Sequence, residues 1–138
     1  MMKQLWHLAG IIFLDYMAGN AILIFLFFIL LPKTWHGYQL AVPAWIMLTI
    51  MTGVFAYWYF RLYPPSPKDL VIAVVAWIVL PFTMSVIYSL FTMGDISYIV
   101  YSLETYVQYA LQALAVGATG YLARRDHTSH LIGEGREI

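Results

Sequence analysis

Four long apolar runs dominate the chain. They cover approximately residues 5–31, 40–60, 70–92 and 96–122. Each run has about 20 residues or more, which at 1.5 Å per residue spans about 30 Å of hydrocarbon. In lipid, only helices and closed barrels satisfy their own backbone hydrogen bonds, and these runs lack the alternation of barrel strands. The pattern therefore predicts an all-α protein, in which residues 1–122 form an antiparallel bundle of four transmembrane helices.

The ends of the runs carry helix-capping signals. Ser66, Pro67 and Asp69 have the pattern of an N-cap, a first helical residue and a capping acid for the third helix. Gly94 is suited to end that helix in a left-handed conformation, and Asp95 is suited to cap the next one. Because this connection is so short, the third and fourth helices are predicted to be antiparallel neighbours.

Basic residues are distributed unevenly between the two predicted ends of the bundle. Only Lys33 falls on one side, whereas the other six fall on the opposite side: Lys3, Arg61, Lys68, Arg124, Arg125 and Arg136. Lys and Arg are enriched in cytoplasmic segments of membrane proteins. The sequence therefore predicts a multi-pass protein of the cell membrane with both termini in the cytoplasm, and residues 123–138 as a short, loosely ordered polar tail.

Composition agrees with a lipid-facing surface and excludes several functions. Hydrophobic residues make up 62% of the 138-residue chain and charged residues only 10%, against about 25% charged in soluble domains. The formal net charge is zero, which argues against nucleic acid as a partner. The chain contains no cysteine, so thiolate catalysis, thiolate metal sites and disulfide exchange are excluded.

Two acids lie well inside predicted spans, Asp15 in the first and Glu104 in the fourth. A charged group at the centre of a membrane helix costs about 2.5–3.5 kcal/mol on insertion scales, and such residues are usually functional. No Lys or Arg lies inside a span. Three explanations stay open: the carboxyls are protonated, they bind a proton or metal cation in transit, or they meet a Lys or Arg of another chain.

Polar residues recur on one face of the predicted fourth helix at spacings of three or four, which indicates a face turned away from lipid. The polar residues of the first helix lie at matching depth in an antiparallel bundle. We therefore expect the first and fourth helices to touch through a polar seam. Its members are Asp15, Asn20, Glu104, Gln108 and Gln112. Together with Tyr101, on the same face of the fourth helix, they are the candidate substrate- or ion-binding residues.

Simpler structural roles compete with these interpretations. Amide side chains often link membrane helices by hydrogen bonds worth about 0.6–2 kcal/mol each. Pro81 is a candidate hinge in the third helix, although proline is also tolerated in membrane helices. The pairs Thr49/Gly53 and Ala113/Gly117 have the four-residue spacing of small-residue packing seams.

The leading hypothesis is a small non-catalytic membrane protein that assembles with itself or with a larger membrane complex, without cofactor or metal. Its expected partners are the lipid bilayer and a second copy or another membrane subunit. The alternative is an ion- or proton-coupled transporter or channel that uses Asp15 and Glu104. A lipid-processing enzyme is a third class, but the sequence offers no nucleophile, metal-ligand set or basic headgroup clamp to accompany its acids.

Overall fold

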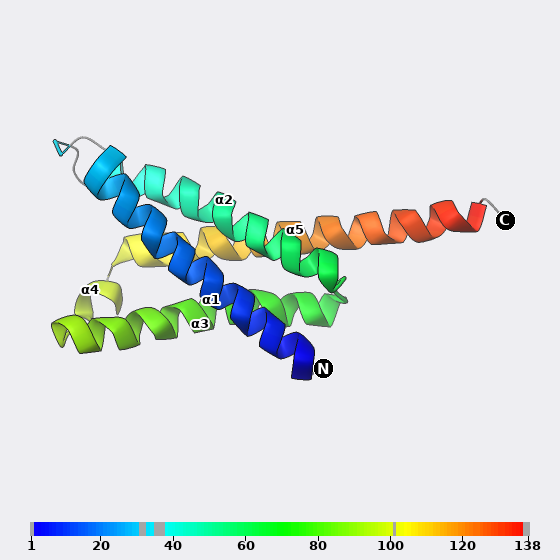
Figure 1. Ribbon diagram of the computed structural model, residues 1–138, viewed down its shortest axis with the longest axis horizontal. Helices are drawn as coiled ribbons and strands as arrows, with labels where there is room; N and C mark the ends of the chain where they lie inside the picture. The colour runs from blue at the N-terminus through cyan, green and yellow to red at the C-terminus, as the bar shows by residue number, and fades with distance from the viewer. Residues whose placement is uncertain (1, 31–32, 35–37, 101, 137–138) are drawn as a thin grey trace.

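All regular structure in the protein is helical within the residues that the computed structural model describes, which are 2–30, 33–34, 38–100 and 102–136. Helix α1 is followed directly by the short π-helix η1, and the long helices α2, α3 and α5 follow, with the short helix α4 before α5 (Figure 1). Their bounds are α1 Met2–Phe25, η1 Leu26–Leu30, α2 Tyr38–Leu62, α3 Pro67–Met93, α4 Ser97–Val100 and α5 Leu103–Arg136.

The predicted all-helical architecture with four long helices is confirmed. Three segments are long and apolar enough to cross a membrane: Met2–Ile29, Gln39–Leu62 and Pro67–Met93. Helix α5 is the fourth long helix, and it is more polar than the other three. It carries Glu104, Gln108 and Gln112 within the apolar run and Arg124, Arg125 and Asp126 beyond it. Figure 1 shows that α1 begins and α5 ends on the side of the bundle that holds the connection between α2 and α3.

The fourth apolar run is not one continuous helix, contrary to expectation. Helix α4 ends at Val100 and α5 begins at Leu103. The first residues of the run include Ile96, Ile99 and Val100, whose branched side chains favour helix less than Leu or Ala does. The Tyr106 hydroxyl donates a hydrogen bond of 2.6 Å to the Val100 carbonyl, which stabilises the break by giving this helix-end acceptor a partner.

The polar tail is also more ordered than expected, because α5 continues through it to Arg136. No proline follows Leu122, and the next residues, Ala123, Arg124 and Arg125, are good helix formers. Figure 1 shows this part of α5 extending past the rest of the bundle. The prediction of a loosely ordered tail was therefore wrong.

The predicted caps are confirmed. The Ser66 hydroxyl accepts from the Asp69 amide at 3.2 Å, and the Asp69 carboxylate accepts from the Ser66 amide at 3.3 Å, which completes a capping box. Gly94 ends α3 with a φ of 68°. The carboxylate of Asp95 accepts from the Ser97 amide at 2.9 Å, and this hydrogen bond lowers the pKa of Asp95.

The helices pack in four pairs: α1 with α2, α1 with α3, α2 with α5 and α3 with α5. Helix α3 is thus a neighbour of α5, as predicted. Among the described residues α1 and α5 form no such packed interface, so the expected direct packing of the first and fourth helices was wrong. They lie diagonally across the bundle, and residues of both helices line the same interior cavity.

Among the described glycines of α5, Gly120 packs most tightly against neighbouring helices. A Cβ there would overlap Leu70 Cδ1 and lie 3.1 Å from Phe60 Cε2. A Cβ at Gly117 would meet nothing within 4 Å. The predicted seam at Ala113 and Gly117 was therefore placed on the wrong glycine. At Gly53 a Cβ would make an ordinary contact of 3.9 Å with Thr119 Cγ2.

The core lies in the half of the bundle nearer the termini, which we call the packed half. It consists of Leu8, Ile11, Ile12, Ala56, Tyr59, Phe60, Ala73, Trp77 and Val116. Tyr59 packs edge-on against both Phe60 and Trp77, with ring centroids 5.4 and 6.4 Å away. Apolar side chains therefore fill this half.

Candidate functional site

Asp15 lies where the packed half ends, near the middle of the bundle, and is only 4% exposed. One carboxylate oxygen, Oδ2, accepts two hydrogen bonds from different helices. The Thr52 hydroxyl donates at 2.9 Å from α2, and the Trp77 indole N–H donates at 2.8 Å from α3. A carboxylate oxygen has two lone-pair positions. Both positions on Oδ2 are thus occupied, and the carboxylate is held in one orientation.

Thr52 links Asp15 to helix α5. Its hydroxyl oxygen accepts a hydrogen bond of 3.3 Å from Gln112 Nε2 while its proton is donated to Asp15. A threonine hydroxyl has a single proton to donate. Because that proton is already used, the amide nitrogen of Gln112 must face Thr52, and its carbonyl oxygen must face away. Asp15, Thr52, Trp77 and Gln112 together form what we call the Asp15 layer.

Three buried polar atoms lack a hydrogen-bond partner among the residues that the structure describes: Asp15 Oδ1, Gln108 Nε2 and Gln112 Oε1. Buried polar groups without partners are rare in native structures, because desolvation then goes uncompensated. All three belong to residues that line a single cavity. The polar groups of this region are therefore positioned by the protein and only partly satisfied by it.

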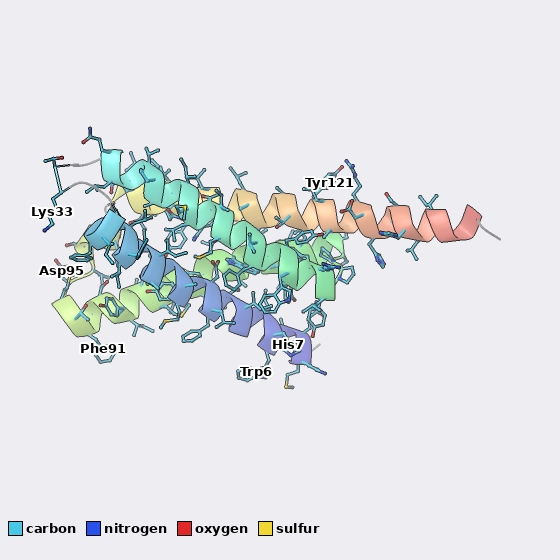
Figure 2. The ribbon with its side chains drawn as sticks, turned by 45° about the horizontal axis from the view of Figure 1, so that its top comes forward. Trp6, His7, Lys33, Phe91, Asp95 and Tyr121 are labelled. Atoms are coloured by element: carbon cyan, nitrogen blue, oxygen red, sulfur yellow. The ribbon has the colours of Figure 1, made fainter. Side chains whose placement is uncertain are left out.

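The cavity has a volume of about 470 Å³ and lies on the opposite side of the Asp15 layer from the packed half. Its walls come from every helix: Tyr16 on α1, Trp45 on α2, Ser85 on α3, Ile99 on α4 and Tyr109 on α5 are examples. The lining continues from Asp15 to Phe27 and Ser102. It thus extends toward the end of the bundle where Figure 2 shows Lys33 and Asp95.

The structure brings five of the six predicted site residues into this cavity lining: Asp15, Asn20, Glu104, Gln108 and Gln112. Tyr101 lies outside the described residues. Asn20 is exposed and donates to the Tyr16 carbonyl of its own helix at 2.9 Å. Gln108 is half-buried.

The sequence predicted that Glu104 lies well inside a span, but the structure places it elsewhere. It is exposed and belongs to the first turn of α5, because the preceding helix has ended at Val100. An acid in this position interacts favourably with the helix dipole. Glu104 therefore belongs to the outer part of the cavity, and Asp15 is the buried acid at its inner end.

Pro81 is buried and also lines the cavity. Helix α3 continues through it without a break. It follows Trp77, the indole donor to Asp15, by four residues. Its missing amide removes the helical hydrogen bond that would otherwise go to the Trp77 carbonyl.

Sequence reasoning missed Thr52 and Trp77. The signal that could have found them is their depth in the bundle. Thr52 lies ten residues before the end of α2 at Leu62, and Trp77 lies ten residues after the start of α3 at Pro67. Both of these helix ends are on the side of the termini (Figure 1). That is about the depth of Asp15 in α1. A polar side chain at matching depth in each helix of an antiparallel bundle is a candidate partner for a buried acid.

A second cleft, of about 730 Å³, lies at the opposite end of the molecule between the end of α2 and the last turns of α5. Arg61, Asp126, His127 and His130 line it. Within the described part of the chain, no three His, Cys, Asp or Glu side chains are grouped so that they could hold a metal ion. His7 is engaged elsewhere, in a hydrogen bond between its ring and the Tyr63 hydroxyl.

Comparisons with protein-family models, with curated proteins and with solved structures give no significant match to this chain.

Proposed function

We propose that this chain is a small integral membrane protein that transports a cation through the cavity that Asp15 lines. Movement of the cation is coupled to movement of protons. The observation that carries the proposal is the unpaired Oδ1 of Asp15, a residue that is only 4% exposed. Asp15 lines one end of a cavity that crosses part of the bundle. An acid inside a membrane bundle typically marks an ion or proton pathway.

Membrane insertion of all four long helices is part of this proposal. Large apolar side chains point outward all around the molecule, including Phe28, Phe91 and Leu114, which are 78%, 88% and 70% exposed. Such a surface is costly in water and suits lipid. The concentration of basic residues at one end supports an orientation with the termini in the cytoplasm of a cell-membrane protein and the cavity facing the outside.

The chemistry of Asp15 supports coupling. Oδ2 is fully occupied by Thr52 and Trp77, so Oδ1 is the atom that takes up either a proton or a cation. Because only one oxygen is free, a proton and a cation cannot occupy it at the same time. Such exclusive occupancy couples the flux of protons to the flux of the cation. Pro81 supplies a point in α3 where the packed half can open toward the other side.

The test is cation-driven proton flux. Proteoliposomes that contain a trapped pH dye receive an inward gradient of Na+, K+ or an organic ammonium ion, because coupled movement needs both the proton and the other cation. We expect the wild type to exceed empty liposomes, and Asp15→Asn to reduce the flux about tenfold or more. Glu104→Gln should reduce it less, because that carboxylate is exposed. Asp95→Asn is the matched control, because Asp95 lies in a turn outside the cavity. Flux equal to empty liposomes, or unchanged by Asp15→Asn, refutes transport.

A second candidate is a non-catalytic subunit or self-associating bundle, and the last turns of α5 favour it. They extend past the bundle and expose Leu131 and Ile132, which are 58% and 55% exposed (Figure 1). An isolated helical segment of this length is marginal in water, so a partner would stabilise it. Native mass spectrometry from a mild detergent should then show an oligomer or an associated chain, and a clean monomer would refute this candidate.

A further inference from the structure

The Asp15 layer contains two buried hydrogen-bond acceptors without partners, Asp15 Oδ1 and Gln112 Oε1, and both residues line the cavity. The Gln112 oxygen is turned away from Thr52 because the amide nitrogen is held by that hydroxyl. We propose that the cavity binds a protonated amine that keeps at least two N–H groups, a primary or secondary ammonium attached to an apolar or aromatic body. This inference rests on the proposed use of Asp15 as the cation-binding group.

The charge of the cavity selects a cation. Asp15 and Glu104 are the charged side chains that line it within the described part of the chain, and both are acidic. Neither Lys, Arg nor His belongs to this lining. In surroundings of low dielectric constant, the attraction between a carboxylate and a cation is far stronger than in water. An anionic ligand would meet only repulsion here.

The size and ligand set argue against a bare metal ion. Magnesium and calcium need about six or more oxygen ligands at about 2.0–2.6 Å. Asp15 can offer only Oδ1, and no grouping of three potential metal ligands occurs among the described residues. A cavity of about 470 Å³ instead falls within the range of small-molecule pockets, which is about 300–1,000 Å³.

The remaining walls suit an apolar or aromatic body. Five of the lining side chains carry six-membered aromatic rings: Tyr16, Phe27, Trp45, Tyr88 and Tyr109. Aromatic faces attract ammonium groups and also pack against apolar surfaces. One of these rings, Tyr109, is held edge-on against Phe82 with centroids 5.9 Å apart, so part of the wall is fixed by packing.

The unpaired acceptors distinguish amines that have N–H groups from quaternary ammonium ions. A quaternary ion satisfies the charge of Asp15 but can donate no hydrogen bond to Asp15 Oδ1 or Gln112 Oε1. A site built to hydrogen-bond its ligand discriminates strongly against an analogue that lacks the donor, because the buried groups stay unpaired. We therefore expect a preference of at least about tenfold for the primary ammonium.

The experiment measures binding to the purified full chain in detergent by titration calorimetry at pH 7. The probes are 2-phenylethylammonium, its N,N,N-trimethyl derivative, 2-phenylethanol and 3-phenylpropionate. We expect the primary ammonium to bind at least about tenfold more tightly than the trimethyl derivative, and the alcohol and the acid to show no binding. Equal affinity of the two cations, or no binding of the primary ammonium, overturns the proposal.

Two variants locate the site. Asp15→Asn should abolish binding of the primary ammonium, and Asp95→Asn should leave it unchanged. Gln112→Leu keeps the carboxylate and should remove the preference for the primary ammonium over the trimethyl derivative. Because that readout is a ratio of affinities, a general loss of stability does not imitate it. An unchanged ratio in Gln112→Leu overturns the role of that acceptor and, with it, the proposal.

The outcomes separate this proposal from proton-coupled transport. Proton flux that depends on Asp15, without binding of any amine, overturns the amine ligand and leaves transport standing. Amine binding that depends on Asp15, without flux in proteoliposomes, refutes transport and leaves the binding site standing.

Discussion

At the scale of single residues, the polar interior depends on Thr52. Its hydroxyl is fully buried, donates to Asp15 and accepts from Gln112, so one side chain connects α1, α2 and α5. Thr52→Val keeps the shape of the side chain and removes both hydrogen bonds. It leaves Asp15 with Trp77 as its remaining donor and Gln112 Nε2 without its acceptor. We expect a loss of about 1–3 kcal/mol in the free energy of unfolding, measured by circular dichroism in detergent.

The matched control is Thr49→Val on the same helix. The Thr49 hydroxyl donates at 2.6 Å to the Trp45 carbonyl, which belongs to its own helix. Such an intrahelical hydrogen bond contributes little to tertiary stability. We expect a change of less than about 1 kcal/mol for this variant. Equal losses for Thr49→Val and Thr52→Val would contradict a special role for the Asp15 layer.

At the scale of elements, the position of α5 against α2 and α3 depends on Gly120. A methyl group there would overlap Leu70 and crowd Phe60, a core residue that is 1% exposed. Gly120→Ala should therefore lower stability by about 1–3 kcal/mol, as is typical when extra atoms enter a packed interior. Thermal unfolding of the purified variant in detergent measures this loss.

Gly117 is the natural comparison on the same helix. A Cβ there has open space, so Gly117→Ala gains helix propensity without a clash. We expect stability to rise by up to about 1 kcal/mol. A loss in Gly117→Ala as large as that in Gly120→Ala would contradict the close packing of α5 against Leu70 and Phe60 at Gly120.

At the scale of the whole molecule, the Asp15 layer divides a packed half from a half that contains the cavity. If the packed half faces the cytoplasm, the cavity is reached from outside the cell. The chain has no cysteine, so single-cysteine variants report this directly. An impermeant maleimide applied to intact cells should label Lys33→Cys and the cavity-lining Ser102→Cys, and should not label Ser129→Cys.

Ser129 lies on the exposed last part of α5, so Ser129→Cys should react once the membrane is permeabilised. Labelling of Ser129→Cys in intact cells would reverse the proposed orientation. Protection of Ser102→Cys, while Lys33→Cys reacts, would show that the cavity is closed to the outside.

Local signals in the sequence predicted most of the fold. The capping box of Ser66 and Asp69, the left-handed Gly94 and the three apolar helices all depend on residues close together in the chain. The break before Leu103 was missed because the apolar character of the fourth run continues across it. Continuous hydrophobicity reports burial or contact with lipid, and it does not report whether the backbone stays helical.

The acids were also found from the sequence, but their relation was not. The presence of an acid in an apolar run can be read directly from the sequence, and so Asp15 and Glu104 were both identified as candidates. The partners of Asp15, which are Thr52 and Trp77, come from two other helices, and which helices meet depends on side-chain packing such as that at Gly120. The sequence by itself determined that the helices form, that they are largely apolar and that Asp15 lies within one of them. Only the tertiary structure decided that α1 and α5 lie diagonally, that Thr52 joins them, and that Glu104 is an exposed acid, because these depend on contacts between distant segments.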